Sequence, residues 1–175
     1  MQLRKLSIIG CGEGWQEAPY DIESWGATKV ILLRSVDLVI DMNDYSGNRW
    51  GTKETSLAMQ AVAKANELNI PVITIKNYPY KEIVDFFKID YFSNTIDYMI
   101  ALAVYKGYTN IDLYGVNMVL EGEYAYEKPG VDYWCGRAMG MGVIVTPQGT
   151  QSTIMRTRDR KVYGYGFEQK GVLYG

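Results

Sequence analysis

An apolar run that leads directly into a glycine-rich turn constrains the fold of this chain more than any other feature. The run is Leu6 to Ile9, and the turn follows as Gly10-Cys11-Gly12-Glu13-Gly14. A short apolar run that ends in glycine is typical of a buried strand. In open α/β sheets such a turn lies at the carboxyl end of a parallel strand, where nucleotides and other anions bind.

Predicted strands and helices alternate along the rest of the chain. This alternation predicts an α/β fold, a Rossmann-like three-layer sandwich with a mainly parallel sheet. We expect a single domain over 1–175, with a C-terminal basic turn and an edge strand or hairpin at about 150–175. Further strands are expected at 30–33, 36–42, 72–75, 111–114 and 143–145, and helices at 52–68, 80–87, from about 94 to 106, and 131–141.

Composition excludes several classes of function. The chain has no histidine, so histidine acid–base catalysis, Ser-His triads and histidine-ligated zinc are all excluded. A formal net charge of -2 gives no global attraction to nucleic acid or to membrane, and we expect neither as a partner. With no signal peptide and no membrane span in sight, we expect a cytoplasmic protein with Cys11 and Cys135 as free thiols.

The glycine turn does not fit the dinucleotide fingerprint. Trp15 stands at the position where that pattern needs its third glycine. The pattern also needs an acid at the end of the second strand, and the predicted second strand ends at Leu33-Arg34-Ser35 without one. NAD and FAD are therefore disfavoured. A turn that offers backbone N–H groups to a phosphate and a purely structural turn are equal alternatives.

Small polar and acidic side chains follow other predicted strands or begin a helix. Asp41 and Asp44 could hold a divalent cation, although residues of this type more often cap the next turn. Ser93, Asn94 and Thr95 precede an apolar helix, where a helix cap and a phosphate contact are compatible. No cofactor is assigned, and a divalent cation is left open.

The second half of the chain adds tyrosine, glutamate and one unusual arginine. A predicted loop after a strand end carries Glu121, Glu123, Tyr124, Tyr126 and Glu127. Side chains at this place commonly contact substrate, and a solvated loop is the equal alternative. Arg137 lies in an otherwise apolar, glycine-rich helix, and it needs a carboxylate or an anionic ligand as its partner. The predicted ligand-binding residues are Gly10, Cys11, Gly12, Glu13, Trp15, Asn43, Ser93, Asn94, Thr95, Asn117, Met118, Tyr124 and Arg137. The catalytic residues are unknown, with Asp41, Asp44 and Glu123 as candidates, and no metal site is assigned.

Several of these segments resemble a known group of proteins when they are taken in order. They are Ile9-Gly10-Cys11-Gly12, the stretch from Tyr91 to Thr95, the stretch from Gly107 to Met118, and Tyr133-Trp134-Cys135-Gly136-Arg137-Ala138. Together they resemble small uncharacterised Rossmann-like proteins often carried by bacteriophages. More distantly, the chain is similar to small bacterial sialyltransferases and to 6-hydroxymethylpterin pyrophosphokinase-like proteins. The resemblance covers roughly residues 6–147.

The resemblance implies roles for individual residues. In the sialyltransferases the glycine turn and the small polar residues before the buried helix line a nucleotide-sugar pocket. The resemblance gives that role here to Gly10, Gly12, Ser93, Asn94, Thr95 and Asn117. Their catalytic base is a histidine, and the matching position here is Arg137, which stays charged at neutral pH.

The leading hypothesis is a protein that binds a nucleotide or a nucleotide-derived ligand. It includes sequestration of a host nucleotide immune signal by a phage anti-defence protein. One alternative is a nucleotide- or nucleotide-sugar-dependent transferase, for glycosyl or pyrophosphoryl transfer. Another is a protein-interaction module without a small-molecule ligand. We expect a homo-oligomer, because the aromatic C-terminal stretch 162–167 needs burial.

Overall fold

The computed structural model of the chain describes residues 3–44, 52–119, 122, 124–157 and 160–169. Its centre is a six-stranded sheet with the strand order β4-β3-β2-β1-β5-β6. All five neighbouring pairs are parallel. The predicted Rossmann-like α/β class is therefore confirmed. The strands are β1 (Lys5–Ile9), β2 (Ser24–Ala27), β3 (Leu38–Asp41), β4 (Val72–Thr74), β5 (Asn110–Tyr114) and β6 (Ile144–Pro147).

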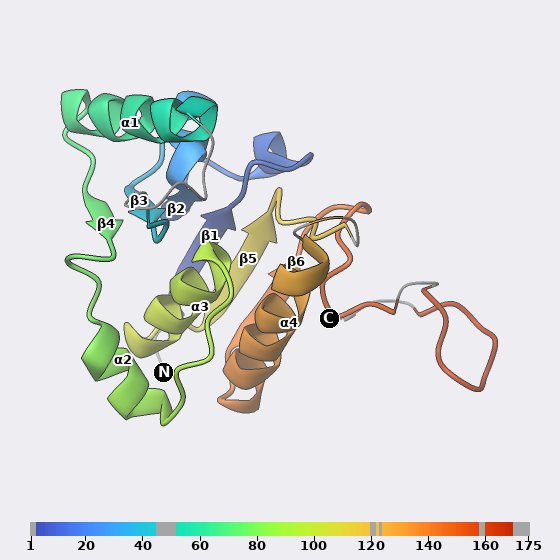
Figure 1. The fold of residues 1–175 in the computed structure, drawn as a ribbon. Helices are drawn as coiled ribbons and strands as arrows, with labels where there is room; N and C mark the ends of the chain where they lie inside the picture. The colour runs from blue at the N-terminus through green and yellow to red at the C-terminus, as the bar shows by residue number, and fades with distance from the viewer. Residues whose placement is uncertain (1–2, 45–51, 120–121, 123, 158–159, 170–175) are drawn as a thin grey trace.

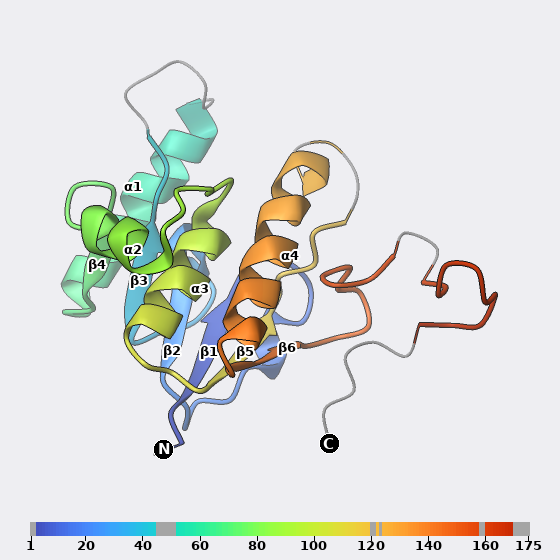
Figure 2. The same cartoon turned by 90° about the horizontal axis from the view of Figure 1, so that it is seen from below.

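Helices cover both faces of the sheet and complete three layers (Figures 1 and 2). On one face, α1 (Thr52–Glu67) packs with the 3₁₀ helix η2 (Thr28–Leu32) over Ile9 and Val39. The other face holds α2 (Tyr80–Phe87), α3 (Thr95–Tyr105) and α4 (Tyr124–Gly140) over Leu6 and Ile8. Alternate side chains of β1 thus enter different cores, as the two-residue period of a strand requires.

The strand order places a topological switch point at the middle of the sheet. From β1 the chain proceeds outward through β2 and β3 to β4, and it then returns through α2 and α3 to β5 on the other side of β1. Because neighbouring connections leave β1 and β5 in opposite directions, a crevice opens outside the carboxyl ends of these two strands. In open α/β sheets ligands bind in this crevice.

Two elements differ from their sequence-based predictions. The expected strand at 30–33 is part of η2, and the strand that replaces it is β2, Ser24–Ala27. Its sequence Ser-Trp-Gly-Ala is short and contains Gly26, where an added Cβ would lie 3.0 Å from the Val30 side chain and 3.2 Å from that of Val36. Helix α4 begins at Tyr124 rather than near residue 131, although Pro129 and Gly130 lie inside it.

After β6, Ser152 and Thr153 bond to the segment that follows β5, and residues 160–169 then form a loop. Lys161 and Glu168 form an isolated antiparallel bridge, at the place where the sequence predicts an edge strand or hairpin. No helix in the described ranges has both the length and the apolar character needed to cross a membrane.

Candidate functional site

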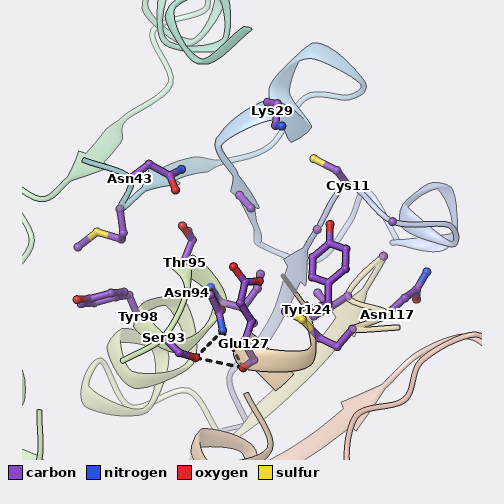
Figure 3. Close-up of a pocket in the computed structure, with 18 of the residues that line it drawn as sticks. Cys11, Lys29, Asn43, Ser93, Asn94, Thr95, Tyr98, Asn117, Tyr124 and Glu127 are labelled. Atoms are coloured by element: carbon purple, nitrogen blue, oxygen red, sulfur yellow. Dashed lines mark hydrogen bonds between the residues drawn. The ribbon is translucent and has the colours of Figure 1, made fainter. Parts of the chain in front are cut away.

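A pocket of about 1020 Å³ lies at the carboxyl edge of the sheet, at the switch point. Its lining comes from the segments that follow β1, β2, β3 and β5 and from the first turns of α3 and α4 (Figure 3). The lining residues include eleven of the predicted ligand-binding residues and catalytic candidates: Gly10, Cys11, Gly12, Asn43, Asp44, Ser93, Asn94, Thr95, Asn117, Met118 and Tyr124.

Glycines hold the segments after β1 and β5 against each other, and we call this contact the glycine junction. The Gly10 N–H donates to the Tyr114 carbonyl and the Gly12 N–H donates to the Gly115 carbonyl, both at 2.8 Å. A Cβ on Gly10 would lie 2.5 Å from the Gly115 oxygen, and one on Gly115 would lie 2.7 Å from the carbonyl oxygens of Gly10 and Gly12. The two turn amides are therefore bonded within the fold, and the structural alternative holds for them rather than the phosphate cradle.

The first turn of α3 is capped by its own side chains. Asn94 is the N-cap, and its Oδ1 accepts from the backbone N–H groups of Ile96 at 2.8 Å and Asp97 at 3.2 Å. The Asp97 carboxylate reaches back and accepts from Ser93 N at 2.7 Å and Ser93 Oγ at 2.8 Å. This reciprocal arrangement resembles a capping box and fixes the start of the helix at the pocket wall.

The same side chains join α3 to α4, and we call this contact the Asp97 junction. Ser93 Oγ and Asn94 Nδ2 both donate to the Glu127 carbonyl, at 3.1 and 3.2 Å (Figure 3). Gly130 of α4 packs so closely that a Cβ there would lie 2.1 Å from Ser93 Oγ and 2.4 Å from Asp97 Oδ2. The two helix starts that line the pocket are thus held together by one buried carboxylate and its partners.

Asp97 is fully buried, with an exposed fraction of 0%. Burial raises the pKa of its carboxyl from 3.8 to about 6, while hydrogen bonds from Ser93 and Asn94 act in the opposite direction. Sequence analysis missed this residue. The signal that could have found it is an acid three positions after the N-cap asparagine of an otherwise apolar helix.

Two groups in the lining are suited to hold an anion. Thr95 is the first helical residue of α3, and Figure 3 shows its side chain directed into the pocket. Its hydroxyl and N–H make no hydrogen bond with any residue in the described ranges. Lys29 of η2 lies on another part of the lining and supplies a cation. A helix N-terminus and a lysine ammonium both favour negative charge. The sequence gives no signal for Lys29, because it lies in a stretch expected to lead into a strand.

The carboxylates after β3 divide between two roles. Asp41 is buried and outside the lining, and its Oδ1 accepts from Asn43 N at 3.2 Å and Asn43 Nδ2 at 2.8 Å. It therefore caps the turn after β3, as the simpler alternative predicts. Asp44 is exposed and lines the pocket. Among the described residues no group of three or more acidic or cysteine side chains could hold a metal.

Aromatic rings line two parts of the pocket. Phe92 stacks on Tyr98 with centroids 4.2 Å apart, and on Trp134 with centroids 4.9 Å apart. Phe92 and Tyr98 both line the pocket. Tyr124 and Tyr126, on the first turn of α4, also line it and are exposed. Neither of these two tyrosines makes a ring contact within the described ranges, so their faces are open to a ligand.

Three of the predicted ligand-binding residues lie outside the pocket lining. Trp15 packs against the core beneath α1 and η2, and Glu13 is exposed with its carbonyl accepting from Asn117 Nδ2 at 3.1 Å. Arg137 is exposed and donates to the Phe87 carbonyl at 3.4 Å. It lies thirteen residues beyond Tyr124, about 20 Å along the helix axis, which is too far to serve the pocket. Glu121 and Glu123 are outside the described residues.

The stretch after β6 braces the pocket segment that follows β5. Ser152 Oγ donates to the Val116 carbonyl at 3.1 Å, and Thr153 N and Oγ1 donate to the Asn117 carbonyl at 2.9 and 3.1 Å. Ser152 is fully buried. The sequence places Ser152 and Thr153 only in the predicted C-terminal segment at about 150–175, and it gives no sign that they support the pocket. Tyr126 and Glu127, which belong to the predicted loop after a strand end, also line the pocket. The lining that sequence analysis missed is Ala27, Lys29, Met42, Phe92, Ile96, Tyr98, Gly115, Val116 and Val119.

Comparisons with known proteins return weak similarity to solved structures of a bacterial sialyltransferase. The sialyltransferase CstII from Campylobacter jejuni, in complex with the substrate analogue CMP-3FNeuAc, is 12% identical with a TM-score of 0.43. The alignment covers 87% of this chain and 83% of that chain. The sialyltransferase CST-II in complex with a trisaccharide acceptor and CMP is 11% identical with a TM-score of 0.41, over 82% of this chain and 80% of that chain.

No protein-family model and no curated protein matches the chain. These solved structures belong to the group that the sequence resembles more distantly, the small bacterial sialyltransferases. At these scores no residue role is carried over from them. The phage-protein and pterin pyrophosphokinase parts of the resemblance stay predictions.

Proposed function

We propose that the pocket at the carboxyl edge of the sheet binds a nucleotide or a nucleotide-derived ligand. The observation that carries this proposal is one pocket at the switch point that combines anion-binding groups with open aromatic rings. A nucleotide needs both of these features, because it joins a charged phosphate to a flat aromatic base.

The phosphate is assigned to the space between Thr95 and Lys29, which lie on different parts of the pocket lining. Thr95 offers a hydroxyl and a backbone N–H at the positive end of the α3 dipole. Lys29 adds a full positive charge. The glycine turn contributes a wall instead of donors, because the N–H groups of Gly10 and Gly12 are bonded to the segment after β5 and a Cβ at either position would meet that segment.

The base is assigned to the tyrosines at the start of α4. Tyr124 and Tyr126 present rings without aromatic partners in the described ranges, and stacking of a base on such a ring contributes about 1–3 kcal/mol. The Tyr98 ring is already stacked on Phe92 and meets Tyr78 edge to face at 5.1 Å, so it is better suited to form a fixed wall.

The proposal is tested by releasing small molecules from the purified protein with denaturant and identifying them by mass spectrometry, together with a nucleotide thermal-shift panel. We expect a bound nucleotide or a rise in Tm with at least one of them. In Thr95→Val and Lys29→Ala the affinity should fall by about tenfold or more, because each loses a contact to a charged group. Lys81→Ala, an exposed lysine of α2 outside the lining, is the matched control.

A nucleotide-sugar-dependent transferase is the second candidate, and the size of the pocket favours it. Ligand pockets commonly span about 300–1,000 Å³, and this one is at the upper end, with room for a second group beside a nucleotide. Asp44 and Glu127 in the lining are carboxylates that could act as a base. Turnover of a nucleotide sugar, abolished in Asp44→Asn or Glu127→Gln, would support this function over simple binding.

Binding without turnover is what the sequence-based hypothesis of sequestration requires. Its anti-defence role stays a prediction from the resemblance. Recovery of the nucleotide chemically intact after long incubation would favour the binder. Absence of any bound molecule and of any thermal shift would contradict both candidates and favour a protein-interaction module.

A further inference from the structure

The loop of residues 160–169, which we call the C-terminal loop, is closed at its base and extends away from the rest of the protein. Gln169 closes it, since Gln169 Oε1 accepts from Thr157 N at 2.8 Å and Gln169 Nε2 donates to the Met155 carbonyl at 3.1 Å. Val162 N also donates to the Phe167 carbonyl at 3.0 Å. Figures 1 and 2 both show this orange-red segment pointing away from the sheet and helices.

The C-terminal loop displays three aromatic side chains to solvent. They are Tyr163, Tyr165 and Phe167, and Tyr163 is 96% exposed. Exposed apolar side chains that stand singly are ordinary, but three on one closed loop form a patch typical of a binding surface. Tyrosine and phenylalanine are enriched in the buried centres of protein interfaces.

The described charged residues of this loop and its base are mostly basic. Arg156 and Arg160 donate to the carbonyls of Ser152 at 3.1 Å and Thr150 at 2.7 Å, so both retain their full positive charge. Lys161 follows, and Glu168 is the acidic residue of the loop. A surface that fits this loop should therefore combine negative charge with an exposed apolar or aromatic group.

The chain itself carries these groups on the connection from β1 to β2, at residues 13–23, which we call the acidic loop. It contains Glu13, Glu17, Asp21 and Glu23, and the sequence has no lysine or arginine between Lys5 and Lys29. All four acids are exposed. Tyr20 lies among them and is 78% exposed.

A buried arginine holds the acidic loop in one shape. Arg34 donates to the carbonyls of Ala18 at 2.7 Å and Trp15 at 3.3 Å, and its guanidinium lies 4.0 Å from the centre of the Tyr20 ring. Contact with a partner therefore needs little ordering of the acidic loop, which reduces the entropic cost of binding.

We propose that the C-terminal loop of one copy of this chain binds the acidic loop of a second copy, in a reciprocal dimer. A second copy is favoured over nucleic acid or a lipid surface because the complementary charge and the exposed tyrosine are both present on the chain itself. Since each copy carries both loops, a two-fold arrangement forms the same contact twice. The aromatic tip is then buried between the copies, and the arginines face the acids.

A charge swap tests this proposal on the full chain. Light scattering after size-exclusion chromatography should give twice the 19.9 kDa mass of one chain for the wild type, and high salt should lower that mass. Arg160→Glu alone and Asp21→Arg alone should each shift the mass toward that of a monomer. The double variant should regain the dimer, and this recovery shows that neither substitution acts by unfolding a loop.

Lys81→Glu on α2 is the matched control for charge reversal and should leave the mass unchanged. Tyr163→Ser with Tyr165→Ser should also favour the monomer. A wild type that is monomeric at every concentration overturns the proposal, as does a dimer that both single charge reversals leave intact. Binding of the monomer to single-stranded nucleic acid or to anionic vesicles through Tyr163 would equally overturn it and would assign the loop to that other partner.

Discussion

The two junctions at the pocket are held by different kinds of contact, one by main-chain groups and the other by side chains. The glycine junction joins β1 to β5 with main-chain hydrogen bonds, and no side chain takes part in its two bonds. The Asp97 junction joins α3 to α4 through side chains around a buried carboxylate. The glycine junction depends on the absence of side chains at its glycines. The Asp97 junction depends on a carboxylate that is buried, where its charged form is unfavourable.

This difference determines how each junction should respond to change. Backbone atoms in the glycine junction cannot move without disturbing the sheet, so steric changes there should be costly and independent of pH. The Asp97 junction contains a titratable group with a displaced pKa, so it should respond to pH as well as to sterics.

Gly115→Ala should have the largest effect on stability. Gly115 has a φ of 61°, and its new Cβ would lie 2.7 Å from two carbonyl oxygens. Left-handed strain and overpacking together should lower the free energy of unfolding by about 3–5 kcal/mol. Urea denaturation measures this, and a loss below about 1 kcal/mol would mean that the glycine junction is loosely packed.

Gly130→Ala should cost less, about 2–3 kcal/mol, because its Cβ meets side-chain oxygens rather than backbone. The contrast is sharpened by adding Ser93→Ala, which removes the oxygen 2.1 Å from the new methyl group. The double variant should recover part of the stability by the same urea assay. If Ser93→Ala makes Gly130→Ala worse by its full single-variant cost, the two residues are not in contact.

The pH dependence of stability should carry the signature of Asp97. Its pKa is 3.8 when unfolded and about 6 when folded, so between these values the folded state binds the proton more tightly. This contribution to stability is therefore full at low pH and is lost as pH rises through 6, by about 2 kcal/mol between pH 4 and pH 7. The unfolding free energy of the wild type minus that of Asp97→Asn should fall over this range. A flat or rising difference would show that Asp97 is not desolvated.

Asn94→Ala should have the smallest of these effects, about 1 kcal/mol, since it removes a helix N-cap. It also removes the hydrogen bond to the Glu127 carbonyl, so amide hydrogen exchange should rise in the first turns of both α3 and α4. An increase confined to α3 would indicate that Asn94 does not couple the two helices.

The contrast between the junctions also explains what the sequence could predict. A glycine turn after an apolar run is visible as a pattern, and so is an N-cap such as Asn94 before an apolar helix. Asp97 was missed because an acid in the first turn of a helix is common on surfaces, and only tertiary packing makes it buried. Gly130 and Lys29 are similar cases, since their importance comes from which distant segment lies opposite them. The prediction that Arg137 binds the ligand was wrong because helix α4 begins seven residues before the predicted start. The first turn of α4 therefore lies at the pocket, and Arg137 lies far from it along the helix axis.

Calorimetric titration of the full chain with the nucleotide that gives the largest thermal shift shows whether this pocket binds the nucleotide. We expect one binding site per chain, affinity at least about tenfold weaker in Thr95→Val, and unchanged affinity in Lys81→Ala. Equal affinity in all three proteins would place the ligand elsewhere. Absence of binding by any nucleotide would contradict the assignment of this pocket.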